Sequence, residues 1–409
     1  MGSLMRLPKI QKTVRLTDTH SLTRVGAEAS SRLDFDSVWR DTVSLYGTGL
    51  HPAIGLCIRH RGEVVLDRTI GHVENAPQGQ TGEVATPETL FNLFSASKLL
   101  TAMVIHALAE DLQLALTDRV VEYIPEFGRR GKRNIRIRHL LNHTAGIPDM
   151  PAGVDPVAIL KTQVIPWDAI HDLRPRSKPG INVAYNPVVA WVLLEEIVRR
   201  ITGLDLRTYA RHRLLDPLGF RHMCYGVGRQ DVSRVARHAY TGPPAPPPMS
   251  RIFERTIGIG LDEAVRLTNT EEFMTGILPS ANVIATGREV TRFLQLLLNG
   301  GVLDGVRVLR RDTVQRAVSD TTPLQLDSTF GFPMRYGLGM MMGGGRFSLF
   351  GLGTKGAFGH LGFTNVVIYA DPSRDLAVSF LNTGKPMLAP GMLRWAWALQ
   401  KLTMTVPRS

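Results

Sequence analysis

The stretch SASKLLTAMVIHAL, residues 95–108, combines a polar start with a regular apolar pattern. Apolar residues at 99, 100, 103, 104, 107 and 108 recur at the spacing of one helix face, which predicts a buried helix. Ser95 and Lys98 stand three residues apart at its start, so their side chains share a face and can approach each other. On its own this pair is a weak signal, because serine commonly caps helices and lysine is common in a first turn.

Regular patterns on both sides of this helix predict the rest of the fold. Before it, we expect a helix over 35–46 and a hairpin over 53–70 that turns at Arg61-Gly62. After it, we expect helices over 189–201 and 207–215. The last third predicts strands and a closing helix, over residues 336–342, 347–350, 365–369, 376–381 and 388–402. This order indicates an α+β protein with one antiparallel sheet, built from both ends of the chain and flanked by the N- and C-terminal helices.

The same patterns divide the chain into lobes. Residues 1–31 are polar and aperiodic and are expected to form an N-terminal arm. Residues 32–110 and 286–405 would then form a discontinuous sheet domain, and residues 111–285 an inserted helical domain. The proline run TGPPAPPPM opens the stretch 241–275 and favours extended chain, because proline cannot continue a helix. We expect this stretch either to cover a site as a lid or to be a long loop.

Composition and charge bound the class of protein. The chain has 409 residues, of which 44% are hydrophobic and 21% charged, as in globular proteins. Its net charge of +12 would suit a nucleic acid or an anionic membrane surface. The densest basic run, residues 129–138, has no interleaved aromatic residues, so we interpret it as a solvated face with at most weak attraction for anionic surfaces. We expect no nucleic-acid partner.

Cysteine usage and terminal sequence indicate the compartment. Cys57 and Cys224 are too few for a disulfide framework and are expected to be reduced. No stretch reaches the roughly 18 apolar residues that a membrane span needs. The N-terminus lacks the apolar core of a secretory signal. These features predict a cytoplasmic protein.

Several familiar reactive motifs are missing from the sequence. No serine lies in Gly-x-Ser-x-Gly, and neither His-Glu-x-x-His nor Cys-x-x-Cys occurs. Gly351, Gly353 and Gly356 match the spacing of a dinucleotide-binding fingerprint, but they lack its strand-to-helix context and the acidic residue that follows it. We therefore expect neither a metal nor an organic cofactor.

Three further segments accompany Ser95 and Lys98 in chain order. Residues 137–149, IRHLLNHTAGIPD, predict a short helix and a turn; Tyr185-Asn186 precede a helix; and His360-Leu361-Gly362 enter an apolar strand. Together these motifs resemble the serine β-lactamase and penicillin-binding-protein-like superfamily, most of all class C β-lactamases and family VIII carboxylesterases. The resemblance covers about residues 35 to 400 and implies a β-lactamase-like fold.

The resemblance implies roles for individual residues. Ser95 would be the nucleophile that is acylated, Lys98 its partner, and Tyr185 the tyrosine of the family's Tyr-x-Asn motif. His360-Leu361-Gly362 takes the place of Lys-Thr-Gly, where esterase-like members often carry His-x-Gly. The oxyanion hole would consist of the backbone N–H groups of Ser95 and Phe363.

Two departures from the family pattern bear on the substrate. The family's asparagine two places after the tyrosine is Pro187 here, with Asn186 one place early, so an amide donor to the acyl side chain is lost. His360, mostly neutral at pH 7, replaces a lysine that would attract a β-lactam carboxylate. His360, Gly362 and Asn186 stay candidates for substrate binding, and both departures favour uncharged esters over β-lactams.

The leading hypothesis is a serine carboxylesterase for short-chain acyl esters, with a small-molecule ester as its partner. Lys98 can act as a base only if burial lowers its pKa from about 10.4, and Tyr185 could serve as a phenolate instead. We expect the two to act as a coupled pair, with Tyr185 protonating the leaving alcohol. A β-lactamase, D-amino-acid peptidase or acyltransferase using the same residues is one alternative, and a non-catalytic binding scaffold is another. The sequence leaves the oligomeric state open.

Overall fold

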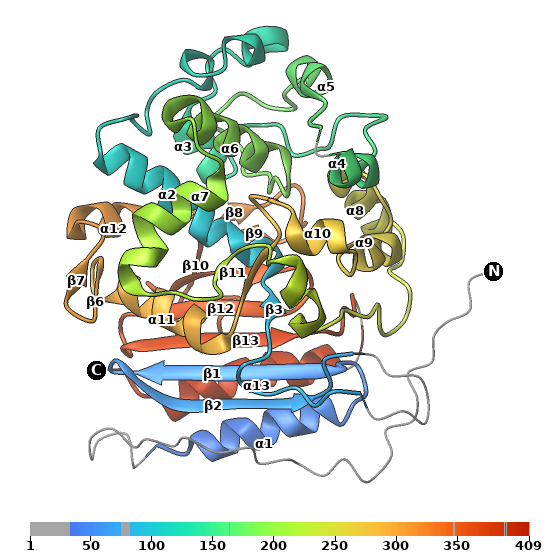
Figure 1. The fold of residues 1–409 in the computed structure, drawn as a ribbon, viewed down its shortest axis with the longest axis vertical. Coiled ribbons are helices and arrows are strands. Elements are labelled where there is room, and N and C mark those ends of the chain that lie inside the picture. The colour runs from blue at the N-terminus through green and yellow to red at the C-terminus, as the bar shows by residue number, and fades with distance from the viewer. Residues whose placement is uncertain are drawn as a thin grey trace.

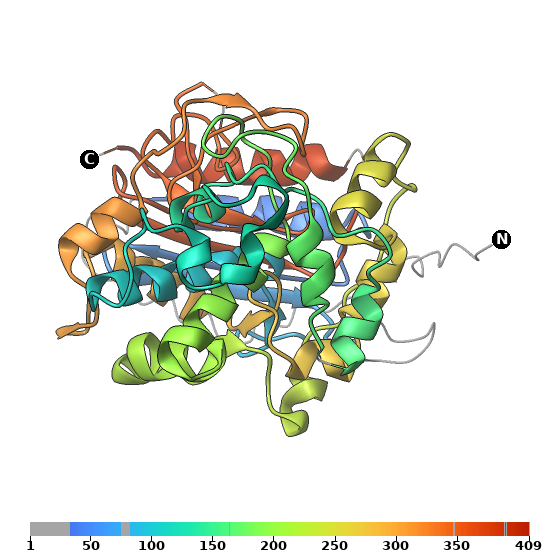
Figure 2. The same cartoon turned by 90° about the horizontal axis from the view of Figure 1, so that it is seen from above.

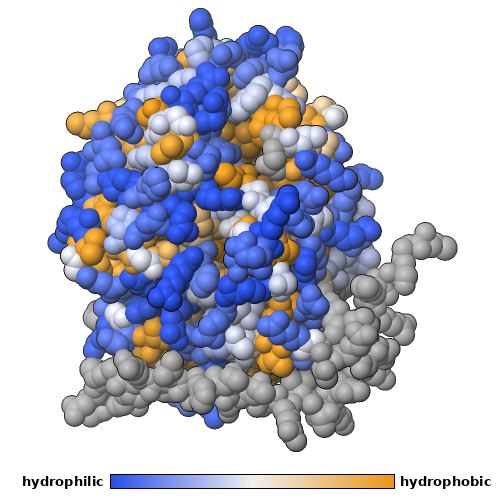
Figure 3. All heavy atoms as spheres, in the orientation of Figure 1, coloured by the Kyte–Doolittle hydropathy of each residue, from blue (hydrophilic) through white to orange (hydrophobic). Residues whose placement is uncertain are grey.

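The computed structural model describes residues 33–74, 82–162, 164–346, 348–387, 389 and 391–408. The N-terminal arm expected over 1–31 lies outside these residues. Within them, the face shown in Figure 3 is mostly hydrophilic, with apolar side chains in small patches. None of the described helices is long and apolar enough to cross a bilayer.

A six-stranded antiparallel sheet combines both ends of the chain, as the sequence predicts (Figure 1). The hairpin from the N-terminal part pairs through its first strand with the last strand of the C-terminal meander. In sheet order the strands are β10 (Met341–Met342), β11 (Phe358–Gly362), β12 (Val366–Asp371), β13 (Leu376–Asn382), β1 (Ala53–His60) and β2 (Glu63–Gly71).

Helices cover both faces of this sheet. The terminal helices α1 (Phe35–Tyr46) and α13 (Gly391–Thr405) pack together on one face, and α11 (Gly287–Leu298) packs against β1 and β13 on the other. Figure 2 shows α13 on one side of the strands. Successive strand residues alternate between two apolar cores, Ile368 in one and Tyr369 in the other. The arrangement confirms the predicted α+β class.

Most of the remaining helices lie between residues 98 and 285, above the sheet in Figure 1. They are α2 (Lys98–Glu110), α3 (Ile137–Leu141), α4 (Pro156–Thr162), α5 (Trp167–Asp172), α6 (Val189–Thr202), α7 (Leu206–Ala210), α8 (Met249–Ile257), α9 (Leu261–Leu267) and α10 (Glu271–Thr275), with α12 (Arg311–Ala317) later in the chain. The predicted helix 95–108 is α2, and its residues 98–108 are all buried. It packs against α6 and α12.

The remaining short strands form a three-stranded sheet and two hairpins. β3 (Phe91–Asn92) pairs with β5 (Val283–Ala285), which also pairs with β4 (Cys224–Tyr225). This small sheet joins the segment before α2 to the segment before α11. The other short strands form two hairpins, β6 (Val302–Leu303) with β7 (Val306–Arg307), and β8 (Gln325–Leu326) with β9 (Pro333–Met334).

The structure corrects four expectations. The strand predicted over 347–350 is wrong: Leu349 and Phe350 lie in a turn, where the Ser348 hydroxyl accepts a hydrogen bond from the Phe350 N–H at 3.1 Å, and Phe347 lies outside the described residues. Phe350 is buried by stacking on Tyr369 rather than by strand pairing. Of the strand predicted over 336–342, only Met341–Met342 belongs to a strand, apart from an isolated bridge at Tyr336.

The other two corrections concern the insert and the basic run. The stretch 241–275 is not a long loop, because it contains α8, α9 and α10. The basic run 129–138 is not solvated throughout, because Lys132 is fully buried. Its ammonium group donates hydrogen bonds to backbone carbonyls in place of water.

Candidate active site

Ser95 lies in a strained 3₁₀ turn, Phe94–Ser97, that leads directly into α2. Phe94 has φ of 50°, a conformation that is costly for a bulky residue and is kept only where its surroundings enforce it. The Asn92 side chain accepts a hydrogen bond from the Phe94 N–H at 3.0 Å, and the Ser97 hydroxyl accepts one from the Val283 N–H at 2.8 Å. These bonds fix the turn on both sides and leave the Ser95 side chain half-buried.

Lys98 lies next to Ser95 and is fully buried. Its Nζ is 3.0 Å from the Ser95 Oγ and donates to the Ser280 carbonyl at 3.1 Å. Within the described part of the chain no carboxylate pairs with it, so no opposite charge offsets the loss of water. Burial therefore lowers the pKa of Lys98 well below its usual range. A neutral amine at this position can accept the Ser95 hydroxyl proton.

Tyr185 completes the group around Ser95. Its ring centroid lies 5.3 Å from the Lys98 Nζ, and the side chain is buried. Burial raises the pKa of Tyr185, and a hydrogen bond with Ser95 opposes this rise. The structure thus brings Ser95, Lys98 and Tyr185 together. It favours a neutral amine and a neutral phenol over the phenolate alternative.

A loop that the sequence analysis missed holds Tyr185 in place. The buried carboxylate of Asp327 accepts hydrogen bonds from the Tyr185 N–H at 3.1 Å and from the Tyr336 hydroxyl at 2.8 Å. Thr329 donates its hydroxyl to the Tyr185 carbonyl at 2.9 Å, and the Phe330 ring stacks on Tyr185 with centroids 4.6 Å apart. The sequence of residues 327–329, Asp-Ser-Thr, is typical of a turn, but nothing else in this local sequence indicates a role beside Tyr185.

His143 also packs against Tyr185. Its ring lies 4.6 Å from the Tyr185 ring, and its Nδ1 accepts a hydrogen bond from the Asn186 N–H at 3.1 Å. Burial lowers the pKa of His143 well below its usual range, so the ring is neutral. This arrangement gives His143 a positioning role and no contact with Ser95 among the described hydrogen bonds.

Asn186, a candidate for substrate binding, makes several hydrogen bonds within the protein. Its side-chain oxygen accepts hydrogen bonds from the N–H groups of Val188 and Ala190, at 3.1 and 3.0 Å, where α6 begins. Its side-chain nitrogen donates to the Ile147 carbonyl. The amide therefore caps a helix and bridges to another segment, which occupies its oxygen and one of its two N–H donors within the protein.

The third motif, His360-Leu361-Gly362, lies in β11 beside the Ser95 turn. The His360 Nδ1 is 2.6 Å from the Leu361 carbonyl, so Nδ1 carries the proton and Nε2 is an acceptor with no partner among the described residues. Burial lowers the pKa of His360 to about 3. As expected from the sequence, this position carries no charge at pH 7.

Gly362 and Phe363 bring this strand against the nucleophile turn. A Cβ on Gly362 would lie 2.2 Å from the Leu93 carbonyl oxygen, so only glycine permits this approach. Phe363 has φ of 51°, and its ring stacks on that of Phe94 with centroids 5.1 Å apart. The two residues expected to supply the oxyanion amides, Ser95 and Phe363, therefore come from adjoining segments.

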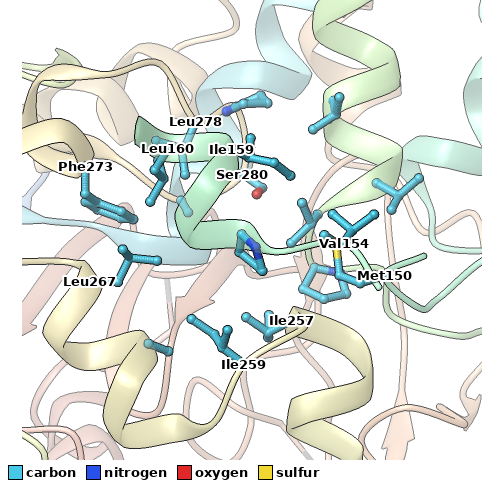
Figure 4. A pocket seen from close by; sticks show the side chains of 18 of the residues that line it. Met150, Val154, Ile159, Leu160, Ile257, Ile259, Leu267, Phe273, Leu278 and Ser280 are labelled. Carbon is cyan, nitrogen blue, oxygen red and sulfur yellow. The ribbon is translucent and has the colours of Figure 1, made fainter. Parts of the chain in front are cut away.

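Ser95 opens into an apolar cavity formed largely by the helical insert. Figure 4 shows Ile159 of α4 and Ile257 and Ile259 near the end of α8 directed toward one space. The cavity has a volume of about 180 Å³. A cavity of about 150 Å³ can hold benzene, so this one has room for a group of that size. Helices α8, α9 and α10, from the predicted lid, form one of its walls.

Known proteins share this architecture. Esterase/β-lactamase LipL of Mycobacterium tuberculosis is 26% identical over 304 residues, covering 71% of this chain and 68% of LipL. A penicillin-binding protein homologue from Caulobacter crescentus has a TM-score of 0.77 at 25% identity, covering 91% of this chain and 97% of its own. A family VIII carboxylesterase has the same fold, with a TM-score of 0.74 at 22% identity over 90% of this chain and 97% of its own.

These likenesses confirm the superfamily that the four sequence motifs indicate. Residues 42–402 match the family model described as beta-lactamase, and the chain belongs to this family of serine hydrolases.

Proposed function

We propose that the protein is a serine carboxylesterase that hydrolyses short-chain acyl esters through an acyl-enzyme on Ser95. The observation that carries this proposal is the 3.0 Å contact between the Ser95 Oγ and a fully buried lysine, at the edge of an apolar cavity. The esterase named in LipL and the fold of the family VIII carboxylesterase support it.

The proposed reaction starts with proton transfer from the Ser95 hydroxyl to the neutral Lys98 amine. The Ser95 oxygen then attacks the ester carbonyl carbon, and the backbone N–H groups of Ser95 and Phe363 stabilise the negative charge on the carbonyl oxygen. The tetrahedral intermediate collapses as Tyr185 gives its proton to the departing alkoxide, and the Lys98 ammonium returns a proton to Tyr185. Water repeats these steps on the acyl-enzyme and releases the acid.

The surroundings of Ser95 favour a neutral ester over a β-lactam. Pro187 lines the cavity and offers no N–H or amide donor, and the amide of Asn186 is engaged by the protein. His360 is neutral and gives no fixed positive charge to a carboxylate. A penicillin would lose two polar contacts that a short neutral ester does not need. The β-lactamase in the name of LipL makes β-lactam hydrolysis the second candidate.

The experiment compares p-nitrophenyl butyrate with nitrocefin on one preparation. Two lost polar contacts, each worth roughly 1 to 3 kcal/mol, predict that kcat/KM for the butyrate exceeds that for nitrocefin by at least about 10²-fold. Intact mass after brief mixing with the ester should show an acyl adduct that Ser95→Ala lacks. Comparable rates would favour the β-lactamase alternative, and an adduct retained by Ser95→Ala would exclude Ser95 as the nucleophile.

A further inference from the structure

Glu195 is the one ionisable residue among the described side chains that line the cavity. It lies on α6, on the helix face that also presents Val188, Val189 and Val192 to the cavity. Val188 and Glu195 are seven residues apart, which corresponds to about 10 Å along a helix axis. Since Tyr185 lies just before this helix, Glu195 marks a part of the cavity remote from the reacting atoms.

The Glu195 carboxyl group has no hydrogen bond and no ion pair with any residue that the structure describes. The neighbouring Glu196 provides the contrast, because it pairs with Arg199 at 2.8 Å and with Arg200 at 2.6 Å. Arg199 is thereby engaged by Glu196. Burial, reinforced by the negative charges of Asp205 and Glu196, raises the pKa of Glu195 to about 8. At pH 7 the group is mostly a neutral acid that can donate and accept a hydrogen bond.

An unpaired carboxyl group in an otherwise apolar cavity disfavours a plain alkyl chain. Such a chain would displace water from the carboxyl group and leave its donor and acceptor unsatisfied. A ligand that presents a hydroxyl group at this point would satisfy both. Sites with a buried polar group discriminate strongly against analogues that lack its partner.

The position of Pro187 indicates which part of the ester reaches Glu195. Pro187 stands two residues after Tyr185. The resemblance implies that the residue at this position contacts the acyl side chain of the substrate. Pro187 lines the cavity just ahead of Val188. The α6 face therefore continues from the acyl position toward Glu195. A hydroxyl group on the acyl chain, several carbons from the carbonyl, would meet the carboxyl group.

We infer that Glu195 is a specificity-determining residue that selects acyl groups bearing a hydroxyl group near the end of the chain. This inference rests on the proposed esterase function. It names the substrate class as hydroxyacyl esters, with the hydroxyl group bound by Glu195 and the carbon chain by the apolar walls.

The test uses pairs of p-nitrophenyl esters with acyl chains of four, six and eight carbons, each with and without a terminal hydroxyl group. The readout is the ratio of kcat/KM for the hydroxylated ester to that for its plain partner. At one chain length this ratio should be at least about tenfold higher in the wild type than in Glu195→Leu. Glu195→Gln, which can still donate and accept, should retain most of the preference. Glu263→Leu, an exposed residue of α9 outside the cavity, should leave the ratio unchanged.

Equal ratios in the wild type and Glu195→Leu at all three lengths would overturn the inference. Hydrolysis of p-nitrophenyl acetate, whose acyl group is too short to reach Glu195, distinguishes this failure from failure of the proposed function. Ser95-dependent acetate hydrolysis with equal ratios removes only the role of Glu195. Absence of any Ser95-dependent ester hydrolysis overturns both.

Discussion

Two lysines of this protein, Lys98 and Lys132, have no exposed surface but differ in their surroundings. The Nζ of Lys132 donates to three backbone carbonyls, those of Arg129 at 2.9 Å, His171 at 2.6 Å and Leu173 at 2.6 Å. The Nζ of Lys98 contacts one carbonyl and the Ser95 hydroxyl. A carbonyl can only accept a hydrogen bond, whereas a hydroxyl can also donate one.

This difference indicates different roles for the two lysines. Three carbonyls match the three N–H donors of an ammonium, and burial lowers the pKa of Lys132 only to about 8, so it stays mostly charged at pH 7 and connects its own segment to the segment of His171 and Leu173. Lys98 has one carbonyl acceptor and a much lower pKa, so its neutral amine can take a proton from Ser95. Lys132 lies closer to bulk solvent than Lys98, so burial lowers its pKa less. Of the two, only Lys98 contacts a hydroxyl group that can give it a proton.

Replacing Lys98 with methionine should have the largest effect on activity. Because Ser95 would lose the group that accepts its proton, kcat/KM for p-nitrophenyl butyrate should fall by at least about 10³-fold, as for members of a catalytic unit. Tyr185→Phe should cost nearly as much, and the double variant little more, if the two act as a pair. Additive losses in the double variant would contradict the coupling.

The same substitution should not destabilise the fold. The unfolded chain holds a proton on Lys98 up to about pH 10.4, whereas the folded chain releases it at lower pH. Wild-type stability should therefore rise with pH between these two values, and Lys98→Met should lack this rise. Thermal unfolding of both proteins from pH 6 to pH 10 checks the prediction, and parallel curves would contradict it.

Lys132→Met should show the reverse pattern. Removing the ammonium leaves three carbonyls without their donor, which should lower the free energy of unfolding by at least about 2 kcal/mol. Since Lys132 lies outside the active site, kcat/KM of the folded variant should stay near the wild-type value. Urea unfolding and ester hydrolysis on the same preparation measure both. A large loss of activity in a folded variant would mean that the two lysines do not differ as described.

Asp327→Asn should have a smaller effect, through Tyr185. The amide keeps the shape of the carboxylate but replaces one acceptor oxygen with a donor, which disturbs the bonds from the Tyr185 N–H and the Tyr336 hydroxyl. We expect kcat for ester hydrolysis to fall by about tenfold with little change in KM, because roughly 1.4 kcal/mol of positioning energy is lost. The control is Asp320→Asn, which alters an exposed carboxylate 3.5 Å from Arg335. A change in KM alone would contradict a positioning role.

Local sequence patterns predict those parts of the site that depend on local geometry. Ser95 and Lys98 are three residues apart, so helix geometry alone brings them together. The helix over 35–46 and the hairpin over 53–70 follow in the same way from residue spacing. The order of the motifs then indicates the family, and with it the approach of Tyr185 and β11.

Contacts between distant segments escape such patterns. Ser280 is 182 residues from Lys98, and Asp327 is 142 residues from Tyr185, so no spacing rule connects them. The basic run around Lys132 suggests a solvated face because carbonyl acceptors 39 and 41 residues away are invisible in the sequence. Asn186 is next to the motif tyrosine, yet its amide faces Ile147 and the start of α6 rather than the cavity. In each case the partner, and not the residue type, decides the role.

The pH dependence of Ser95 acylation tests the role of Lys98 most directly. Rapid mixing with p-nitrophenyl butyrate gives the rate of the first turnover as a burst of p-nitrophenol at each pH. Because burial lowers the pKa of Lys98 and raises that of Tyr185, the rate should increase as Lys98 loses its proton, with a midpoint well below the usual lysine value of about 10.4. The pH dependence should be absent in Lys98→Met. A midpoint at the usual lysine value, or the same curve in Lys98→Met, would contradict the claim that buried Lys98 is the base.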